Sequence, residues 1–188
     1  MMRAPEFMDR DLLRRIAERD ASALADLYDR HAQLLFALIV RILRNRSEAE
    51  DALQDVFLRV WQRAETYDPA FGSPVAWLVR IARNRAIDRL RLRRSHPDQE
   101  PQPLTSEPAE PAFRAPDETA ILGQQRSAID GALSALAPDD RTLMEAAFFE
   151  GYTQSELAGK FGLPLGTVKT RLRRGMQQMR EQLQHLEK

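Results

Sequence analysis

Residues Thr153 to Arg174 constrain the fold most, because this short segment signals a helix start, a helix stop and a second start. Thr153 and Glu156 have the spacing of a capping box, in which two side chains satisfy backbone N–H groups at a helix N-terminus. Gly162 permits a left-handed helix end, and Pro164 cannot continue the helix. The sequence therefore predicts two short helices joined by a tight turn.

The second of these helices has an apolar side and a cationic side. Apolar residues recur at three- and four-residue steps and predict one buried stripe, formed by Val168, Leu172, Met176, Met179 and Leu183. No acidic residue occurs between Leu165 and Arg180. The side chains expected to face outward are Thr167, Thr170, Arg173 and Arg174, with Lys169 and Arg171 on the flanks.

Such a face suits a helix in the major groove, where arginine can donate two hydrogen bonds to guanine and flanking cations can hold phosphates. The alternative is a solvated basic face on an ordinary helix hairpin. The turn spacing and the absence of acids together favour DNA reading.

The composition excludes several classes of protein. The 188 residues, 43% hydrophobic and 30% charged, suffice for one or two small domains with cores. No apolar run is long enough to span a membrane and no signal-type core opens the chain, so we expect a cytoplasmic protein. With no cysteine and three scattered histidines, we expect no disulfide, no metal site and no cofactor. The formal net charge is zero, but the charge is segregated along the chain.

Proline and acidic residues alternate from Ser95 to Glu118, and this composition cannot pack as helix or strand. We therefore expect an all-α fold of two small helical domains, residues 9–94 and 119–188, joined by a flexible acidic linker at 95–118. No strand alternation is present. The C-terminal domain would end in the helix-turn-helix.

Helix signals in the first domain are equally local. His31 lies on the apolar stripe of a long helix and is expected to be a core-edge residue. Ser47 and Glu50 have the spacing of a second capping box, and Ser73 followed by Pro74 predicts the start of a fourth helix.

The fourth helix carries seven arginines against one acid between residues 77 and 94. Helical spacing places on one polar face Trp77, Arg80, Asn84, Asp88 and Arg91. Tyr67 and Phe71 lie in the loop just before it. Aromatics beside a cationic helix suit unstacked, single-stranded bases. The alternative, equally supported for Trp77, is that this residue belongs to the core and that Asp88 pairs with neighbouring arginines.

Acidic residues gather on the third helix, where Asp51, Gln54 and Asp55 are expected on an exposed flank. Carboxylates can hold magnesium for phosphodiester cleavage, can place favourable charge at a helix N-terminus, or can form a docking surface for a protein. Docking is favoured because no histidine or lysine base and no third carboxylate at ligand spacing lie nearby.

Three motifs in order resemble the extracytoplasmic-function sigma factors of bacteria: AEDALQDVFLRVW at 49–61, WLVRIARNRAIDRLR at 77–91 and PLGTVKTRLRRG at 164–175. The resemblance implies two helical DNA-binding domains, called region two and region four. It also implies binding to the β′ and β subunits of core RNA polymerase, recognition and melting of promoter DNA, and control by a cognate anti-sigma protein that could be membrane-bound. It implies no catalysis and no small-molecule substrate.

The resemblance also assigns roles to residues. Polymerase binding would fall to Asp51, Gln54, Asp55 and Phe57. The loop from Tyr67 to Ser73 would capture a flipped base of the −10 element, and the family's RN-x-x-x-D signature falls on Arg83, Asn84 and Asp88. The full expected −10 set is Tyr67, Phe71, Trp77, Arg80, Arg83, Asn84, Asp88 and Arg91, and the −35 set is Thr167, Lys169, Thr170, Arg171, Arg173 and Arg174. Thr170 and Arg173 depart from common family residues, so the preferred −35 sequence does not carry over.

Two other functions remain open at this point. A free-standing helix-turn-helix regulator would use the N-terminal half for oligomerisation or sensing, but it has no need for a second nucleic-acid surface. A carboxylate-based nuclease is the more distant alternative.

Overall fold

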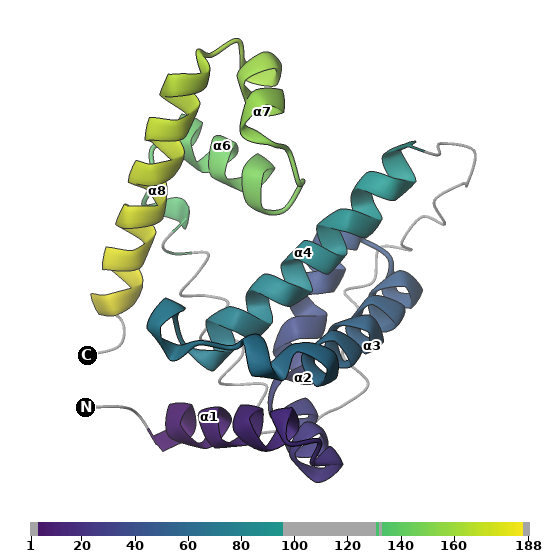
Figure 1. The fold of residues 1–188 in the computed structure, drawn as a ribbon. Coiled ribbons are helices and arrows are strands. Elements are labelled where there is room, and N and C mark those ends of the chain that lie inside the picture. Colours follow the sequence, from purple (N-terminus) through teal and green to yellow (C-terminus); the bar gives the residue numbers. More distant parts are fainter. Residues whose placement is uncertain (1–3, 96–130, 132, 186–188) are drawn as a thin grey trace. The chain divides into compact units, whose positions relative to one another are not determined.

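The computed structural model describes residues 4–95, 131 and 133–185, and the chain divides into two units, Met1–Pro111 and Ala112–Lys188 (Figure 1). All regular structure in the described residues is helical, which confirms the expected all-α fold. Apart from Ser95, the predicted linker at 95–118 lies outside the described residues. No described helix is both long and apolar enough to cross a membrane.

The N-terminal unit is built around α2 (Ala21–Leu43), which packs against α1 (Ala4–Ala17), α3 (Arg46–Arg63) and α4 (Pro74–Ser95). The side chain of Asp20 caps α2 by accepting hydrogen bonds from the N–H groups of Ser22 and Ala23. One apolar side of each helix faces the shared core, as in Ile16, Leu35, Val56 and Leu78, all of which are fully buried.

His31 is buried at the edge of this core, as expected. Its Nε2 lies 2.9 Å from Oδ2 of Asp9, and Arg30 Nε donates to Oδ1 of the same carboxylate at 2.8 Å. Burial raises the pKa of Asp9, but the hydrogen bonds and charges of His31 and Arg30 outweigh it and hold the pKa below its usual value. The carboxylate therefore ties α1 to α2.

The start of α3 differs from the prediction. Arg44 is left-handed at the end of α2, and Asn45 caps α3 by accepting from the N–H of Glu48 at 3.0 Å. The proposed Ser47–Glu50 capping box is wrong, because Asn45 is an equally good cap that follows the turn directly. Glu50 instead accepts from Arg46 Nε at 3.0 Å.

Two short 3-10 turns, Ala64–Thr66 and Pro69–Phe71, connect α3 to α4. Gly72 then has a φ of 138°, a conformation that only glycine adopts easily. Ser73 Oγ accepts from the N–H of Ala76 at 3.3 Å, so the predicted start of α4 is confirmed.

The C-terminal unit contains α6 (Pro138–Phe148), α7 (Gln154–Phe161) and α8 (Leu165–His185). The predicted capping box is present: Glu156 N–H donates to Thr153 Oγ1 at 3.2 Å, and Thr153 N–H donates to Glu156 Oε2 at 2.6 Å. Gly162 ends α7 with a φ of 62°, as expected. A core shared by the three helices is formed by Leu143, Ala146, Leu157 and Val168.

The apolar stripe of α8 is partly different from the prediction. Val168 is fully buried, and Leu172 and Met179 are partly buried, but Met176 is 53% exposed. Gly175 is the buried residue on that turn, and a Cβ placed there would meet Met144 Cγ at 3.0 Å. Residues 168, 172, 175 and 179 are separated by steps of four, three and four and therefore lie on one side of the helix. Residue 176 lies at the edge of that side. The side chain of Leu183 is outside the described part.

Candidate functional site

The acidic surface of α3 is smaller than the sequence predicts. Asp51 has a side chain 66% exposed, and Gln54 is exposed beside it. Asp55 is half-buried: its Oδ2 accepts from Arg85 Nε at 3.0 Å and Nη2 at 2.6 Å, and from Arg89 Nη2 at 2.7 Å. Burial raises the pKa of Asp55, but the hydrogen bonds and charges of Arg85 and Arg89 together lower it by more than burial raises it. The pKa is therefore below its usual value. Asp55 therefore joins α3 to α4 and is not a free surface charge.

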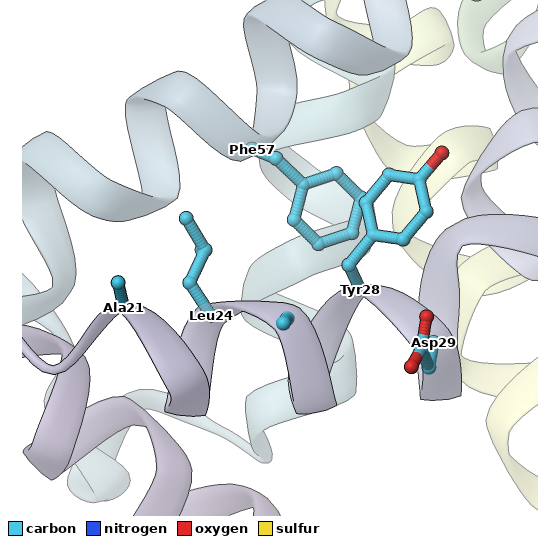
Figure 2. A pocket seen from close by; sticks show the side chains of 6 residues that line it. Ala21, Leu24, Tyr28, Asp29 and Phe57 are labelled. Atoms are coloured by element: carbon cyan, nitrogen blue, oxygen red, sulfur yellow. The ribbon is translucent and has the colours of Figure 1, made fainter.

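Phe57, expected on the polymerase-binding surface, is only 6% exposed. Its ring lies 4.7 Å from the ring of Tyr28, measured between centroids. Figure 2 shows the two rings side by side at one end of a shallow groove between α2 and α3. The groove has a volume of about 320 Å³ and is lined by Ala21, Leu24, Ala25, Tyr28, Asp29 and Phe57.

Leu58 is 55% exposed on α3, one turn after Gln54. Exposed large apolar side chains, here Leu58 and Tyr28, are typical of a protein interaction site when they gather on one surface. Tyr28 and Leu58 were not singled out in the sequence, because each reads as one more member of an amphipathic helix.

The arginines of α4 fall into two groups. One group faces α3, where Arg85 and Arg89 bind Asp55, and Arg93 lies 3.5 Å from Glu48 Oε1 and donates to the carbonyl oxygen of Leu43 at 3.3 Å. The other side of the helix is exposed and carries Arg80, Asn84, Asp88 and Arg91. Arg83 is half-buried between these two sides of α4. Burial is the larger cause that lowers its pKa, and repulsion from Arg91 is the smaller one.

Trp77 does not belong to the exposed face, although its spacing places it there. The side chain is only 8% exposed. Tyr67 packs its ring against Trp77 in an edge contact at 5.9 Å and donates from its hydroxyl to the carbonyl oxygen of Gly72 at 3.0 Å. Phe71, at the tip of this connection, is 85% exposed.

Two of the cations that the sequence places on the outer side of α8 are paired with α6 instead. Lys169, Thr170 and Arg173 are exposed, and Thr167 is half-buried. Arg174 Nη2 donates to Oδ2 of Asp140 on α6, and Arg171 Nε lies 3.5 Å from Oδ1 of the same residue. Asp140 is only 2% exposed. Sequence reasoning missed it, because nothing local distinguishes it from Asp139.

Among residues 4–95, 131 and 133–185, no group of three or more histidines or acids is arranged to hold a metal ion.

Comparison with known families gives two matches. Residues 27–96 match the family described as Sigma-70 region 2, and residues 132–181 match Sigma-70 region 4. The ECF RNA polymerase sigma factor SigK of Mycobacterium sp. (strain KMS) is 34% identical over 165 residues, which cover 88% of this chain and 85% of that protein. SigK of Mycobacterium tuberculosis (strain CDC 1551 / Oshkosh) is 32% identical over 169 residues, 90% of each chain.

Solved structures also resemble the chain. Rhodobacter sphaeroides SigE, in a complex with the anti-sigma ChrR, is 35% identical, with 91% of this chain and 95% of that chain covered and a TM-score of 0.45. CnrH, in a complex with the cytosolic domain of CnrY, is 23% identical, with 95% and 98% covered and a TM-score of 0.42.

Proposed function

Because the chain belongs to the extracytoplasmic-function RNA polymerase sigma factors, we propose a division of its work among three surfaces. The α3 surface binds core polymerase, the exposed side of α4 holds the melted −10 strand, and the exposed side of α8 reads the −35 duplex. Residues 9–94 and 119–188 are the two functional domains, and 95–118 is the linker. The factor acts in the cytoplasm, where the polymerase is, and has no catalytic activity of its own.

The observation that carries this proposal is the presence of solvent-exposed cationic side chains in both units. In the first unit Arg80 and Arg91 lie on the side of α4 that faces away from α3. In the second unit Lys169 and Arg173 are exposed on α8. A regulator with one DNA-binding domain needs only one such surface, whereas promoter recognition followed by melting needs two.

Polymerase docking is assigned to Asp51 and Gln54 together with the groove at Tyr28 and Phe57. An exposed carboxylate and an apolar groove on the same domain support electrostatic steering combined with apolar burial. Phe57 contributes one wall of the groove. Asp55 acts indirectly, by holding α4 in place against α3 through Arg85 and Arg89.

The −10 contacts are assigned to the exposed residues Arg80, Asn84, Asp88 and Arg91 and to the loop tip at Phe71. Unstacked bases gain roughly 1–3 kcal/mol each when they stack on aromatic rings, and arginines follow the backbone. Trp77 supports this site from within, because its ring holds Tyr67 in place.

A transcription assay tests the proposal. Purified core polymerase should initiate at a defined promoter only when this chain is added. A free-standing regulator would bind DNA yet fail to confer initiation on core enzyme, and that result would refute the proposal.

We further propose that an anti-sigma protein holds the factor inactive by covering these surfaces. The chain has no cysteine, so it has no thiol with which to sense redox stress directly. A relative of 35% identity, SigE, is bound by an anti-sigma. Co-expression with the adjacent open reading frame, followed by a pull-down, tests this. A purified factor that responded to an inducer without a partner would contradict it.

A further inference from the structure

The buried carboxylate of Asp140 lies in the first turn of α6 and faces α8. It is 2% exposed, and its Oδ1 has no hydrogen-bond partner among the residues the structure describes. A buried carboxylate is costly unless it is paired. The N-terminus of α6 offers partial compensation, and among the described residues full positive charge comes from Arg174 and Arg171. Through these contacts, Asp140 joins α6 to α8.

The guanidinium of Arg174 is bound to Asp140 on one side and exposed to solvent on the other. Its Nη2 donates to Asp140, yet its side chain remains 56% exposed. A guanidinium has five N–H donors in a rigid plane, so fixing one of them orients the rest. On the helix, residue 174 lies next to Thr170, whose side chain is exposed and donates to the carbonyl oxygen of Gly166 at 2.9 Å.

We propose that Asp140 is a positioning residue for DNA reading: it fixes the guanidinium of Arg174, so that the remaining donors meet one base edge of the upstream promoter element. This rests on the proposed role of α8. An arginine free in solvent loses rotamer entropy when it binds a base, whereas one already held by a buried carboxylate loses less. Asp140 contributes to discrimination between sequences without touching DNA.

Two other roles for Asp140 predict different results. A purely structural residue would change the stability of the unit but not the sequence preference of the folded protein. A purely electrostatic residue would weaken binding to all DNA alike, so its removal would raise affinity for every sequence. Asp139 is the matched control, because it lies on the same turn, has a side chain 81% exposed and is 3.9 Å from Arg171 Nη1.

The test uses holoenzyme reconstituted from core polymerase and the full chain, with a library of promoter duplexes randomised over the upstream element. Asp140→Asn should reduce the preference at one position by about five- to a hundredfold, the range of one bidentate base contact. Affinity for non-preferred duplexes and its salt dependence should stay unchanged. Asp139→Asn should keep the wild-type preference. Wild-type preference in Asp140→Asn, or higher affinity for all duplexes, would overturn the proposal.

A second variant separates positioning from folding. Arg174→Lys keeps the positive charge but loses the planar fork, and residue 174 is exposed enough to tolerate it. It should lose preference at the same position, and Asp140→Asn combined with Arg174→Lys should lose no more than either alone. Additive losses, or a shift at another position, would contradict the proposal even if Asp140→Asn proved unstable. Arg173→Ala tests α8 itself: if it leaves duplex binding intact, the proposed function of α8 fails instead.

Discussion

At the residue scale, Asp51 is the sharpest test of the docking surface. Its side chain is 66% exposed and its nearest described cation, Arg89 Nη1, is 3.8 Å away, so it contributes little to the fold. Asp51→Lys should therefore lower affinity for core polymerase by about tenfold or more, because it reverses charge at a complementary interface. Binding can be measured by titrating labelled core enzyme.

Glu50→Lys is the matched control for this substitution. Glu50 lies on the same turn, has a side chain 54% exposed and pairs only with Arg46 among the described residues, but it points about 100° away around the helix. Equal losses from both variants would mean that net charge, and not a docking surface on α3, governs polymerase binding.

Individual side chains were predicted well where their environment is local, except at the Ser47–Glu50 capping box, and poorly where it is not. Thr153, Gly162 and Ser73 act on neighbours within three or four residues, and all three predictions are confirmed. Trp77 is the first residue of the predicted polar face, yet its side chain is buried and contacts Tyr67 in the connection before α4. Asp140 accepts a hydrogen bond from Arg174, which lies 34 residues away in the sequence. Periodicity describes one helix, so it cannot say which part of that helix another segment covers.

At the scale of elements, ion pairs join α3 to α4. Asp55 accepts three hydrogen bonds from Arg85 and Arg89, and Glu48 lies near Arg93. The sequence shows acids on one helix and arginines on the next, which predicts two separate interaction surfaces. Several of those charges instead neutralise each other between the helices. The fold was readable from helix signals, but the size of each functional surface depends on which charges remain after packing.

Asp55→Asn should destabilise the N-terminal unit. The amide keeps the shape but loses the charge that holds two guanidinia, which should cost about 1–2 kcal/mol of unfolding free energy after allowance for partial exposure. Chemical denaturation followed by circular dichroism measures this. Asp51→Asn, on the same face but exposed, should leave the unfolding free energy nearly unchanged. An equal loss in both variants would contradict the assigned pairing.

The same carboxylate gives a prediction for pH. The pKa of Asp55 is lower in the folded protein than in the unfolded chain, because the bonds from Arg85 and Arg89 outweigh burial. Its stabilisation is thus complete above the unfolded pKa of about 4 and is lost as pH falls through the folded pKa. The difference in unfolding free energy between wild type and Asp55→Asn should be constant near neutrality and shrink below about pH 4. A difference that grew on acidification would show that the carboxylate is not held ionised by these arginines.

At the scale of the whole molecule, a net charge of zero conceals two cationic surfaces in two units. Acids on α3 and α6 neutralise some arginines, while others remain exposed on α4 and α8. A division of this kind permits the factor to bind the duplex with one unit and the melted strand with the other. The two activities should therefore be separable by mutation.

Asn84→Ala and Arg173→Ala should separate them. Asn84 is exposed on α4, and loss of its hydrogen bonds to an unstacked strand should reduce promoter opening about fivefold while upstream duplex binding stays intact. Arg173 is exposed on α8, and its loss should weaken upstream binding by about 1–3 kcal/mol without reducing opening once the DNA is saturating. Each variant is assayed in holoenzyme by binding to the −35 duplex and by permanganate reactivity of the −10 thymines.

The double variant completes the argument. Because Asn84 and Arg173 belong to separate units, their effects on the free energy of forming the open promoter complex should add to within about 0.5 kcal/mol. Asn84→Ala that weakened −35 binding as much as Arg173→Ala does would place both residues on one surface. A strongly non-additive double variant would mean that reading the upstream duplex and holding the melted strand are one coupled event, and the assignment of separate tasks to the two units would then be wrong.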